Sequence, residues 1–237
     1  MEKLYCKNNQ VFTQIGSLPF TDTKQAIEYS LKHDIPFLPE LPKLGDGMLE
    51  YIKNPGKMSC LEDFCKEKFE TLKVQCIGPS TLLQDPKNNY TEDEAVDRVY
   101  RHIAEIIWSL NASEYMIFLD EPSLGYGTTR YEELWEPIMR SIGDDVIWGV
   151  HVCGNMMWDH LFDSDMKIIS FDASQQDITL YYPRMGKQVA WGIEKEEDIK
   201  DWQEGDLITL PCGLGTKDEK HAYDSLDMLL KVSSKFR

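Results

Sequence analysis

Short apolar runs alternate with amphipathic stretches along the whole chain. Runs of about 4–8 apolar residues rich in β-branched and aromatic side chains are typical of buried strands, whereas apolar positions three and four apart indicate helices. The apolar runs predict strands at eight places in the sequence: Thr13–Leu18, Pro36–Leu41, Lys73–Ile77, Tyr115–Asp120, Val146–Cys153, Lys167–Asp172, Gln188–Ile193 and Leu207–Pro211.

Helical patterns lie between these runs. The clearest begins at Thr91, because Glu94 follows three residues later as in a capping box and apolar residues then recur at helical spacing. Five more ranges show a helical pattern. Three of them are Asp22–His33, Tyr131–Ser141 and Glu196–Trp202, and the other two, Met156–Phe162 and Asp177–Tyr182, are expected to form only short helices. A last helix is expected over Asp218–Lys235.

The alternation of strand and helix predicts an α/β fold with a parallel sheet. Eight strand–helix units in 237 residues match the roughly 250 residues of a closed (β/α)8 TIM barrel, whereas a doubly wound sheet usually has fewer strands. No repeat, low-complexity tract or linker divides the sequence. We therefore predict a single domain, residues 1–237, built as a (β/α)8 barrel.

Charge narrows the choice of partners. The chain has 25 Lys and Arg against 41 Asp and Glu, a net charge of −16 that is spread along the sequence, and such a surface repels nucleic acid. No apolar run approaches the roughly 20 residues of a membrane span, and the start MEKLYCKNNQ lacks a signal segment. We expect a cytoplasmic protein without nucleic-acid or membrane partners, whose six cysteines are thiols or metal ligands.

Polar residues gather at the carboxyl ends of the predicted strands, where a (β/α)8 barrel carries its active site. In chain order the strands end at Ser17, Glu40, Gly78, Asp120 with Glu121, His151 with Cys153, Asp172, Glu194 and Cys212. This edge of the sheet is therefore the candidate site.

A metal-ligand pattern is part of this set. His151 and Cys153 are two residues apart on one predicted strand, so both side chains point to the same face. Cys212 and Asp172 end two further strands, and thiolates with one imidazole and a carboxylate are ligands suited to Zn²⁺. The alternative is structural: free cysteines are often small buried packing residues, and a histidine can be hydrogen-bonded in a core.

The chain resembles the catalytic barrel of cobalamin-independent methionine synthase and its shorter relatives, within the superfamily that also contains uroporphyrinogen decarboxylase. The resemblance lies in segments that follow in the same order from Ile15 to Gly215: IGSLPFTDTKQAIE, KVQCIGPSTL, FLDEPSL, HVCGN, IISFDAS and LPCGLG. It implies a short, single-barrel member of that family and a zinc-dependent methyl transfer to a thiol.

The resemblance also implies a ligand set, in which zinc is held by His151, Cys153, Asp172 and Cys212. The family's full-length enzyme has Glu where this chain has Asp172, which is one methylene shorter, so we expect Asp172 to be the weakest ligand. Zinc lowers the pKa of a bound thiol and so makes it a nucleophile at neutral pH.

Further roles follow from the same resemblance. Homocysteine would be held by the turn from Ile15 to Ser17 and by carboxylates that pair with its ammonium group, here Asp120 and Glu40. Asp120 is also a candidate catalytic residue, and so is Glu194, which stands where the full-length enzyme has a histidine for folate chemistry. The alternatives for Asp120 and Glu40 are a loop-bracing acid and a solvated loop acid.

The methyl donor is a further expectation, and two rival functions stay open. The half of the enzyme that completes the folate site has no counterpart in this one-barrel sequence, so we expect a methylcorrinoid such as methylcobalamin, free or on a carrier protein, as donor. The rivals are an enzyme like uroporphyrinogen decarboxylase, which would need cationic side chains for a polycarboxylate substrate, and a non-catalytic zinc- or corrinoid-binding barrel.

Overall fold

The computed structural model describes residues 10–124, 131–143, 145–154, 156, 158–179 and 184–237. This part of the chain forms one sheet of six parallel strands, in which each strand pairs with the next along the sequence. The strands are β1 (Phe69–Ile77), β2 (Ala112–Asp120), β3 (Val146–Val152), β4 (Ile168–Asp172), β5 (Gln188–Gly192) and β6 (Leu207–Thr209).

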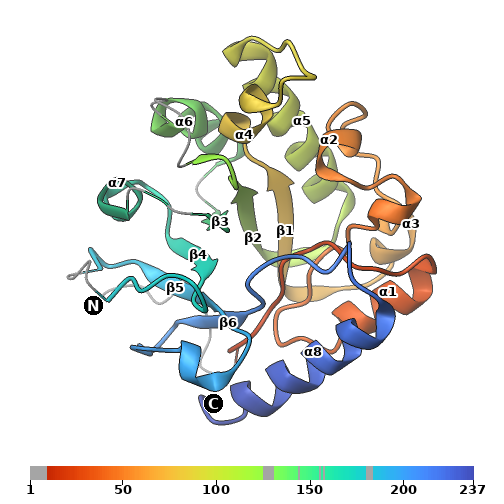
Figure 1. Cartoon of the computed structure of the whole chain (residues 1–237). Helices are drawn as coiled ribbons and strands as arrows, with labels where there is room; N and C mark the ends of the chain where they lie inside the picture. The colour runs from red at the N-terminus through yellow and green to blue at the C-terminus, as the bar shows by residue number, and fades with distance from the viewer. Residues whose placement is uncertain (1–9, 125–130, 144, 155, 157, 180–183) are drawn as a thin grey trace.

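The expected closed (β/α)8 barrel is wrong: the sheet is an open, curled half-barrel (Figure 1). The last six predicted strands are present, but the first two form only isolated bridges within the described residues, Phe12 to Ile208, Ser17 to Glu40 and Phe37 to Lys73. Proline supplies no N–H to a ladder, and prolines recur at every third position from 36 to 42. The apolar pattern of these segments predicted correctly that they are buried, but it predicted wrongly that they pair continuously with neighbouring strands.

Helices lie around the outer side of the curled sheet (Figure 1). Five of them fall where helices were predicted: α1 (Thr23–Ser30), α5 (Glu92–Ser109), α6 (Tyr131–Ile142), α7 (Trp158–Asp163) and α8 (Glu219–Ser233). Short helices that the pattern did not predict are α2 (Met48–Tyr51), α3 (Leu61–Phe64), α4 (Pro79–Gln84) and the 3₁₀ turn η1 (Pro42–Leu44).

Two of the predicted helices are not borne out as written. The range Glu196–Trp202 contains only a 3₁₀ turn, η3 (Glu196–Asp198). The range Asp177–Tyr182 is not helical over its first three residues, and its remainder lies outside the described residues. No helix in the described part of the chain is both long and apolar enough to cross a membrane.

The start of α5 is capped as predicted. The Glu94 N–H donates to the Thr91 hydroxyl at 3.3 Å, and the Thr91 N–H donates to the Glu94 carboxylate at 2.9 Å. Two N–H groups that the first helical turn leaves without partners are thus satisfied.

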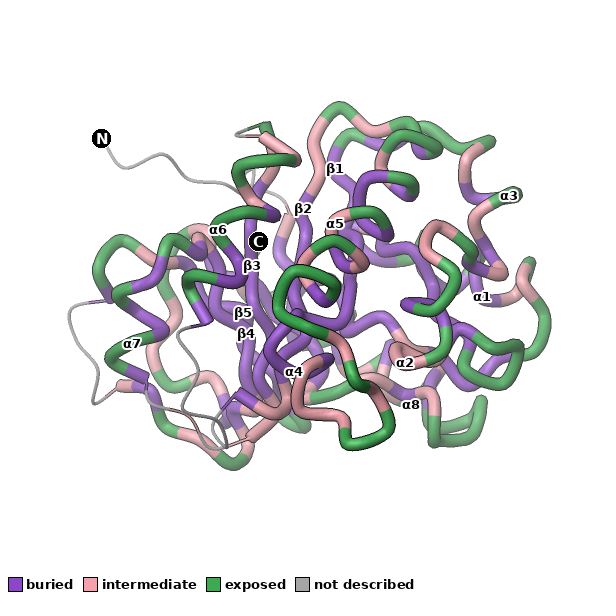
Figure 2. Tube along the Cα trace, turned by 90° about the horizontal axis from the view of Figure 1, so that it is seen from above, coloured by how far each residue is buried: buried purple, intermediate pink, exposed green. Residues whose placement is uncertain are grey.

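The curled sheet separates two apolar clusters. The larger fills the space between the sheet and the surrounding helices, and Figure 2 shows buried strands at the centre with exposed positions on the outer helices and loops. The smaller consists of Ile35, which lies outside the strands, and of inward-facing residues of β2 to β6: Met116, Phe118, Ile147, Ile168, Ala190 and Leu207. This inner cluster fills the concave side of the sheet and forms a floor.

Strand register places the polar residues above this floor. Asp120 pairs with His151 and His151 with Ser170 across β2, β3 and β4, so their side chains share the inner face. Gly149 lies two residues before His151, and a Cβ there would stand 2.4 Å from the Phe118 ring. Glycine at this position lets the ring pack beneath the polar row.

Replacing Thr91 by alanine should lower the free energy of unfolding by about 1 kcal/mol, because the α5 capping box loses its hydroxyl acceptor. Equilibrium unfolding in urea measures the change. Thr216→Ala, at an exposed threonine in a turn, is the matched control and should alter stability much less. Equal losses in both variants would contradict the capping role.

Candidate metal and substrate site

Three potential metal ligands converge at the carboxyl edge of the sheet. His151 is the penultimate residue of β3, Cys153 directly follows this strand, and Cys212 lies in the turn after β6. The Cys153 sulfur is 3.2 Å from His151 Nε2 and 3.9 Å from the Cys212 sulfur, and the three ligand atoms all lie within 4.8 Å of one another. The fold therefore brings together three of the four ligands that the sequence predicted.

The His151 ring is held by a neighbour on β4. Its Nδ1 lies 3.0 Å from the Ser170 hydroxyl, and this contact directs Nε2 towards the two sulfurs. Metal-binding histidines commonly use the second ring nitrogen in this way, which sets the ring's orientation and tautomer. The ring is almost completely buried, with 2% of its surface exposed, so its position is constrained from all sides.

The spacing of the three atoms fits a tetrahedral zinc ion. Zn–S bonds of about 2.3 Å and Zn–N bonds of about 2.0–2.1 Å separate two sulfur ligands by about 3.8 Å, and sulfur from nitrogen by about 3.5 Å. The observed separations of 3.9 and 3.2 Å are close to these values. Three protein ligands leave a fourth position for a substrate, the arrangement typical of catalytic zinc sites.

The two thiols differ in acidity. The Cys153 thiol and His151 hydrogen-bond to the Cys212 sulfur and lower the pKa of Cys212 to about 4. The same contact with Cys212, together with burial, raises the pKa of Cys153. The contact therefore favours the thiolate form of Cys212, and a cation bound between the sulfurs would favour the thiolate form of Cys153 as well.

Asp172, the fourth predicted ligand, is turned to its own loop. One carboxylate oxygen accepts hydrogen bonds from the Ser174 N–H at 2.9 Å and from the Ser174 hydroxyl at 2.6 Å. Asp172 is not part of the cluster that the other three ligands form in the described residues, although its charge contributes to the raised pKa of Cys153. Asp172 therefore lies near the site and influences it through its charge.

A cavity of about 290 Å³ opens beside the three ligands. Ile15, Ser17, Glu40 and Asp120, all the predicted substrate-binding residues, line it together with His151, Cys153 and Cys212. Asp120 and Glu40 are 4% and 3% exposed, and in the described part of the chain neither Asp120 Oδ1 nor Glu40 Oε1 has a hydrogen-bond partner. Unpaired buried carboxylate oxygens are costly, so they favour a ligand that donates hydrogen bonds.

Burial and neighbouring charges shift the pKa values of the Asp120 and Glu40 carboxyl groups. Burial raises the pKa of Asp120 to about 6, and His151 and Lys73 oppose that rise. Burial, followed by the charge of Asp120, raises the pKa of Glu40 well above its usual range. A cationic group between them would lower both pKa values, because an opposite charge favours the ionised form.

Two acids named with the site lie outside the cavity. Glu194, the second candidate catalytic residue, is exposed after β5, and its backbone N–H donates to Asp198 at 2.9 Å. Glu121 is fully buried but accepts from the Ser80 and Thr81 N–H groups and from the Trp135 indole. Glu121 therefore joins α4 to α6.

Two polar residues of β1 were missed from the sequence. Lys73 and Gln75 lie beneath Asp120 on the inner face, and Gln75 lines the cavity. The signal was present, because alternate positions of an otherwise apolar buried strand carry Thr71, Lys73 and Gln75. Burial lowers the pKa of Lys73 to about 8, against the carboxylates of Asp120 and Glu40, so it stays mainly cationic at neutral pH.

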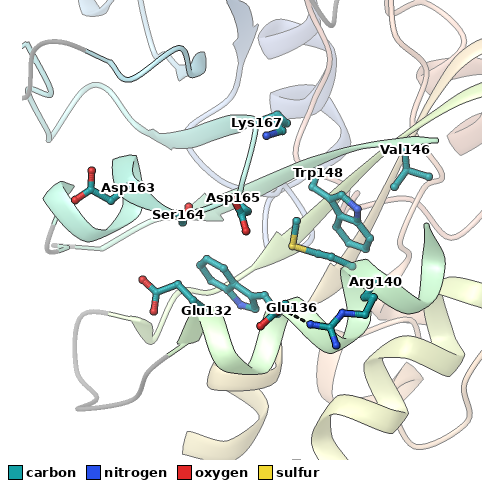
Figure 3. A pocket seen from close by; sticks show the side chains of 11 residues that line it. Glu132, Glu136, Arg140, Val146, Trp148, Asp163, Ser164, Asp165 and Lys167 are labelled. Carbon is teal, nitrogen blue, oxygen red and sulfur yellow. Dashed lines mark hydrogen bonds and ion pairs between the residues drawn. The ribbon is translucent and has the colours of Figure 1, made fainter. Parts of the chain in front are cut away.

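A second cavity, of about 540 Å³, lies at the opposite end of the sheet. Val146 and Lys167, at the amino ends of β3 and β4, face α6 across it, and on α6 Glu136 accepts from Arg140 (Figure 3). None of the predicted site residues lines this cavity. Ligands of parallel sheets bind at the carboxyl ends of the strands, so the smaller cavity is the candidate site.

No protein-family model and no curated protein matches this chain.

Replacing Ser170 by alanine should weaken zinc binding by about tenfold, because His151 loses the partner that orients its ring. Competition with a chromophoric chelator at fixed pH measures the affinity. Ser164→Ala is the control, since this buried serine bonds to nearby backbone through Leu161 and Met166. Unchanged affinity in Ser170→Ala would show that the ring is held by packing alone.

Proposed function

We propose that this protein is a zinc-dependent methyltransferase that moves a methyl group from a methylated donor to the thiol of an amino acid such as homocysteine. The observation that carries the proposal is the convergence of His151, Cys153 and Cys212 on one wall of a cavity whose other walls hold the buried carboxyl groups of Asp120 and Glu40. A thiol end and an ammonium end of one ligand match these two parts of the cavity. The resemblance to the methionine synthase catalytic barrel supports the same assignment.

The ligand's charge follows from the cavity's lining. Asp120 and Glu40 are the buried acids, and Glu50 lies at the same cavity, whereas the described residues that line it include no Lys or Arg. An ammonium group would supply hydrogen bonds to Asp120 Oδ1 and Glu40 Oε1, which have no partner in the described part of the chain. A sulfonate or a second carboxylate would meet like charge.

Different residues of the chain have different roles in the proposed reaction. His151, Cys153 and Cys212 would hold a zinc ion, which as a Lewis acid would lower the pKa of the acceptor thiol so that its proton is lost to solvent at neutral pH. Asp120 and Glu40 bind the ammonium group, and the turn at Ser17 closes the cavity beside Gly213 and Gly215. The acceptor sulfur then attacks the methyl carbon, and the bond between the methyl group and the donor breaks with its electron pair on the donor.

The proposed donor is a methylcorrinoid, free or on a carrier protein. Cys212 is exposed, so the sulfur side of the site is accessible to a donor much larger than the 290 Å³ cavity. We place the reaction in the cytoplasm, where cysteine thiols stay reduced.

The two rival functions predict different properties of the site. A decarboxylase acting on a polycarboxylate would need cations where this cavity presents Glu40 and Asp120. A non-catalytic zinc- or corrinoid-binding protein would bind its ligand without turnover, which the second experiment below distinguishes.

Purified wild-type protein should carry about one zinc, and Cys153→Ser or Cys212→Ser should remove it, since thiolates hold such ions most strongly. Asp172→Ala should lose less zinc than either, because its carboxylate bonds to Ser174. Metal analysis after expression with added zinc measures these contents, and Cys65→Ser is the control cysteine. Metal-free wild-type protein would contradict the proposal.

Wild-type protein should demethylate methylcobalamin faster with homocysteine than with coenzyme M, whose sulfonate would face Asp120 and Glu40. Asp120→Asn should slow the homocysteine reaction at least about tenfold through loss of a charge-assisted hydrogen bond. The visible spectrum of the corrinoid follows the reaction, and Asp177→Asn is a surface control.

Faster reaction with coenzyme M, or an unimpaired Asp120→Asn variant, would overturn the acceptor assignment. If free methylcobalamin does not react, the same two thiols are compared with a methylated corrinoid protein as donor. Stoichiometric zinc without turnover in both assays would favour the non-catalytic alternative.

A further inference from the structure

Lys73 is a charged side chain buried completely on the inner face of the sheet. Its Nζ donates to Gln75 Oε1 and lies 4.7 Å from the centre of the Phe118 ring, which belongs to the apolar floor. Burying an ammonium group costs free energy, and the attraction of Asp120 and Glu40 offsets that cost only in part, because burial still lowers the pKa of Lys73. A buried charge of this kind is weak evidence of added stability.

Lys73 and the Gly16 N–H together determine how the Gln75 amide is oriented. Lysine carries only donors, and the Gly16 N–H, which reaches the same Gln75 oxygen at 3.0 Å, is also a donor. Two donors on one side require the amide oxygen there. The Gln75 NH₂ group must then face the other way, where it donates to Asp120 Oδ2.

The Gln75 amide contacts both sides of the part of the cavity that is proposed to bind an ammonium group: Asp120 on one side, and Gly16, which is hydrogen-bonded to Glu40, on the other. Gln75 Nε2 occupies one oxygen of Asp120, which leaves Oδ1 without a partner in the described residues. Gln75 Oε1 holds Gly16, whose carbonyl accepts from the Glu40 N–H at 3.1 Å. Residues from three separate segments are thus aligned by a single side chain.

We propose that Lys73 and Gln75 are positioning residues that make this cavity specific for an acceptor with an ammonium group. Lys73, together with the Gly16 N–H, orients the Gln75 amide, and Gln75 in turn aims Asp120 and anchors the turn at Gly16. Neither residue contacts the reacting sulfur. The inference rests on the proposed function, because the ammonium group is that of the proposed thiol acceptor.

The test is equilibrium binding, measured by calorimetry on zinc-loaded protein under reducing conditions. Homocysteine is compared with 4-mercaptobutyrate, which has the same thiol and carboxylate but no amino group. Lys73→Met and Gln75→Leu should each weaken homocysteine binding about tenfold, the value of one charge-assisted hydrogen bond, and change 4-mercaptobutyrate binding less than about twofold.

Two controls separate positioning from a general structural effect. Gln188→Leu removes another buried glutamine, which bonds to the Gly205 carbonyl outside the cavity, and should leave both affinities unchanged. In an Asp120→Asn background, Lys73→Met should cause no further loss of homocysteine binding, because Lys73 acts through Asp120.

Equal weakening of both thiols, or losses that add to that of Asp120→Asn, would overturn the positioning role. Zinc content and the thermal unfolding midpoint report whether each variant is folded, and Gln75→Leu, which keeps Lys73, decides the matter if Lys73→Met does not fold. Failure of both variants to fold would assign the pair to folding and also overturn the proposal. If wild-type protein binds the two thiols equally, the ammonium subsite of the proposed function fails instead.

Discussion

The register of a curled parallel sheet is the constraint on which this site depends. Side chains alternate between the two faces of each strand, so the residue pairs Asp120–His151 and His151–Ser170 fall side by side on the inner face. The apolar floor below them excludes water from one side. A shift of one residue in β3 would turn His151 to the outer face and replace it with an apolar neighbour.

Buried charge is the second feature of the inner face, and it follows from the first. Asp120, Glu40 and Lys73 are almost completely buried. Lys73 lowers the pKa of both carboxyl groups, the charge of Asp120 raises the pKa of Glu40, and both carboxylates raise the pKa of Lys73. Groups of this kind rarely add stability, because desolvation offsets their attraction. They are characteristic of sites where binding a charged ligand completes the network. The hydrogen bonds through Gln75 order the carboxyl group of Asp120 in advance.

The loss of the second predicted strand, one part of the departure from a closed barrel, has a local cause with little effect on the site. Pro36 and Pro39 remove N–H groups from this segment, so it meets β1 only through an isolated bridge at Phe37 and Lys73. Its end still places Glu40 beside Ser17 through another such bridge. An apolar pattern reports burial, and it does not report whether a buried segment has the donors for a continuous ladder.

Local patterns of side chains were sufficient to predict the six regular strands along the chain, the capping box at Thr91 and the common face of His151 and Cys153, because each depends on neighbours within a few residues. The fold was needed to show that Cys212, 59 residues beyond Cys153, lies 3.9 Å from it. It also decided that Asp172 turns to Ser174, that Glu194 is exposed, and that Gln75 joins Gly16 to Asp120. These relations depend on the curl of the sheet and on the paths of loops between strands, which no local pattern of side chains encodes.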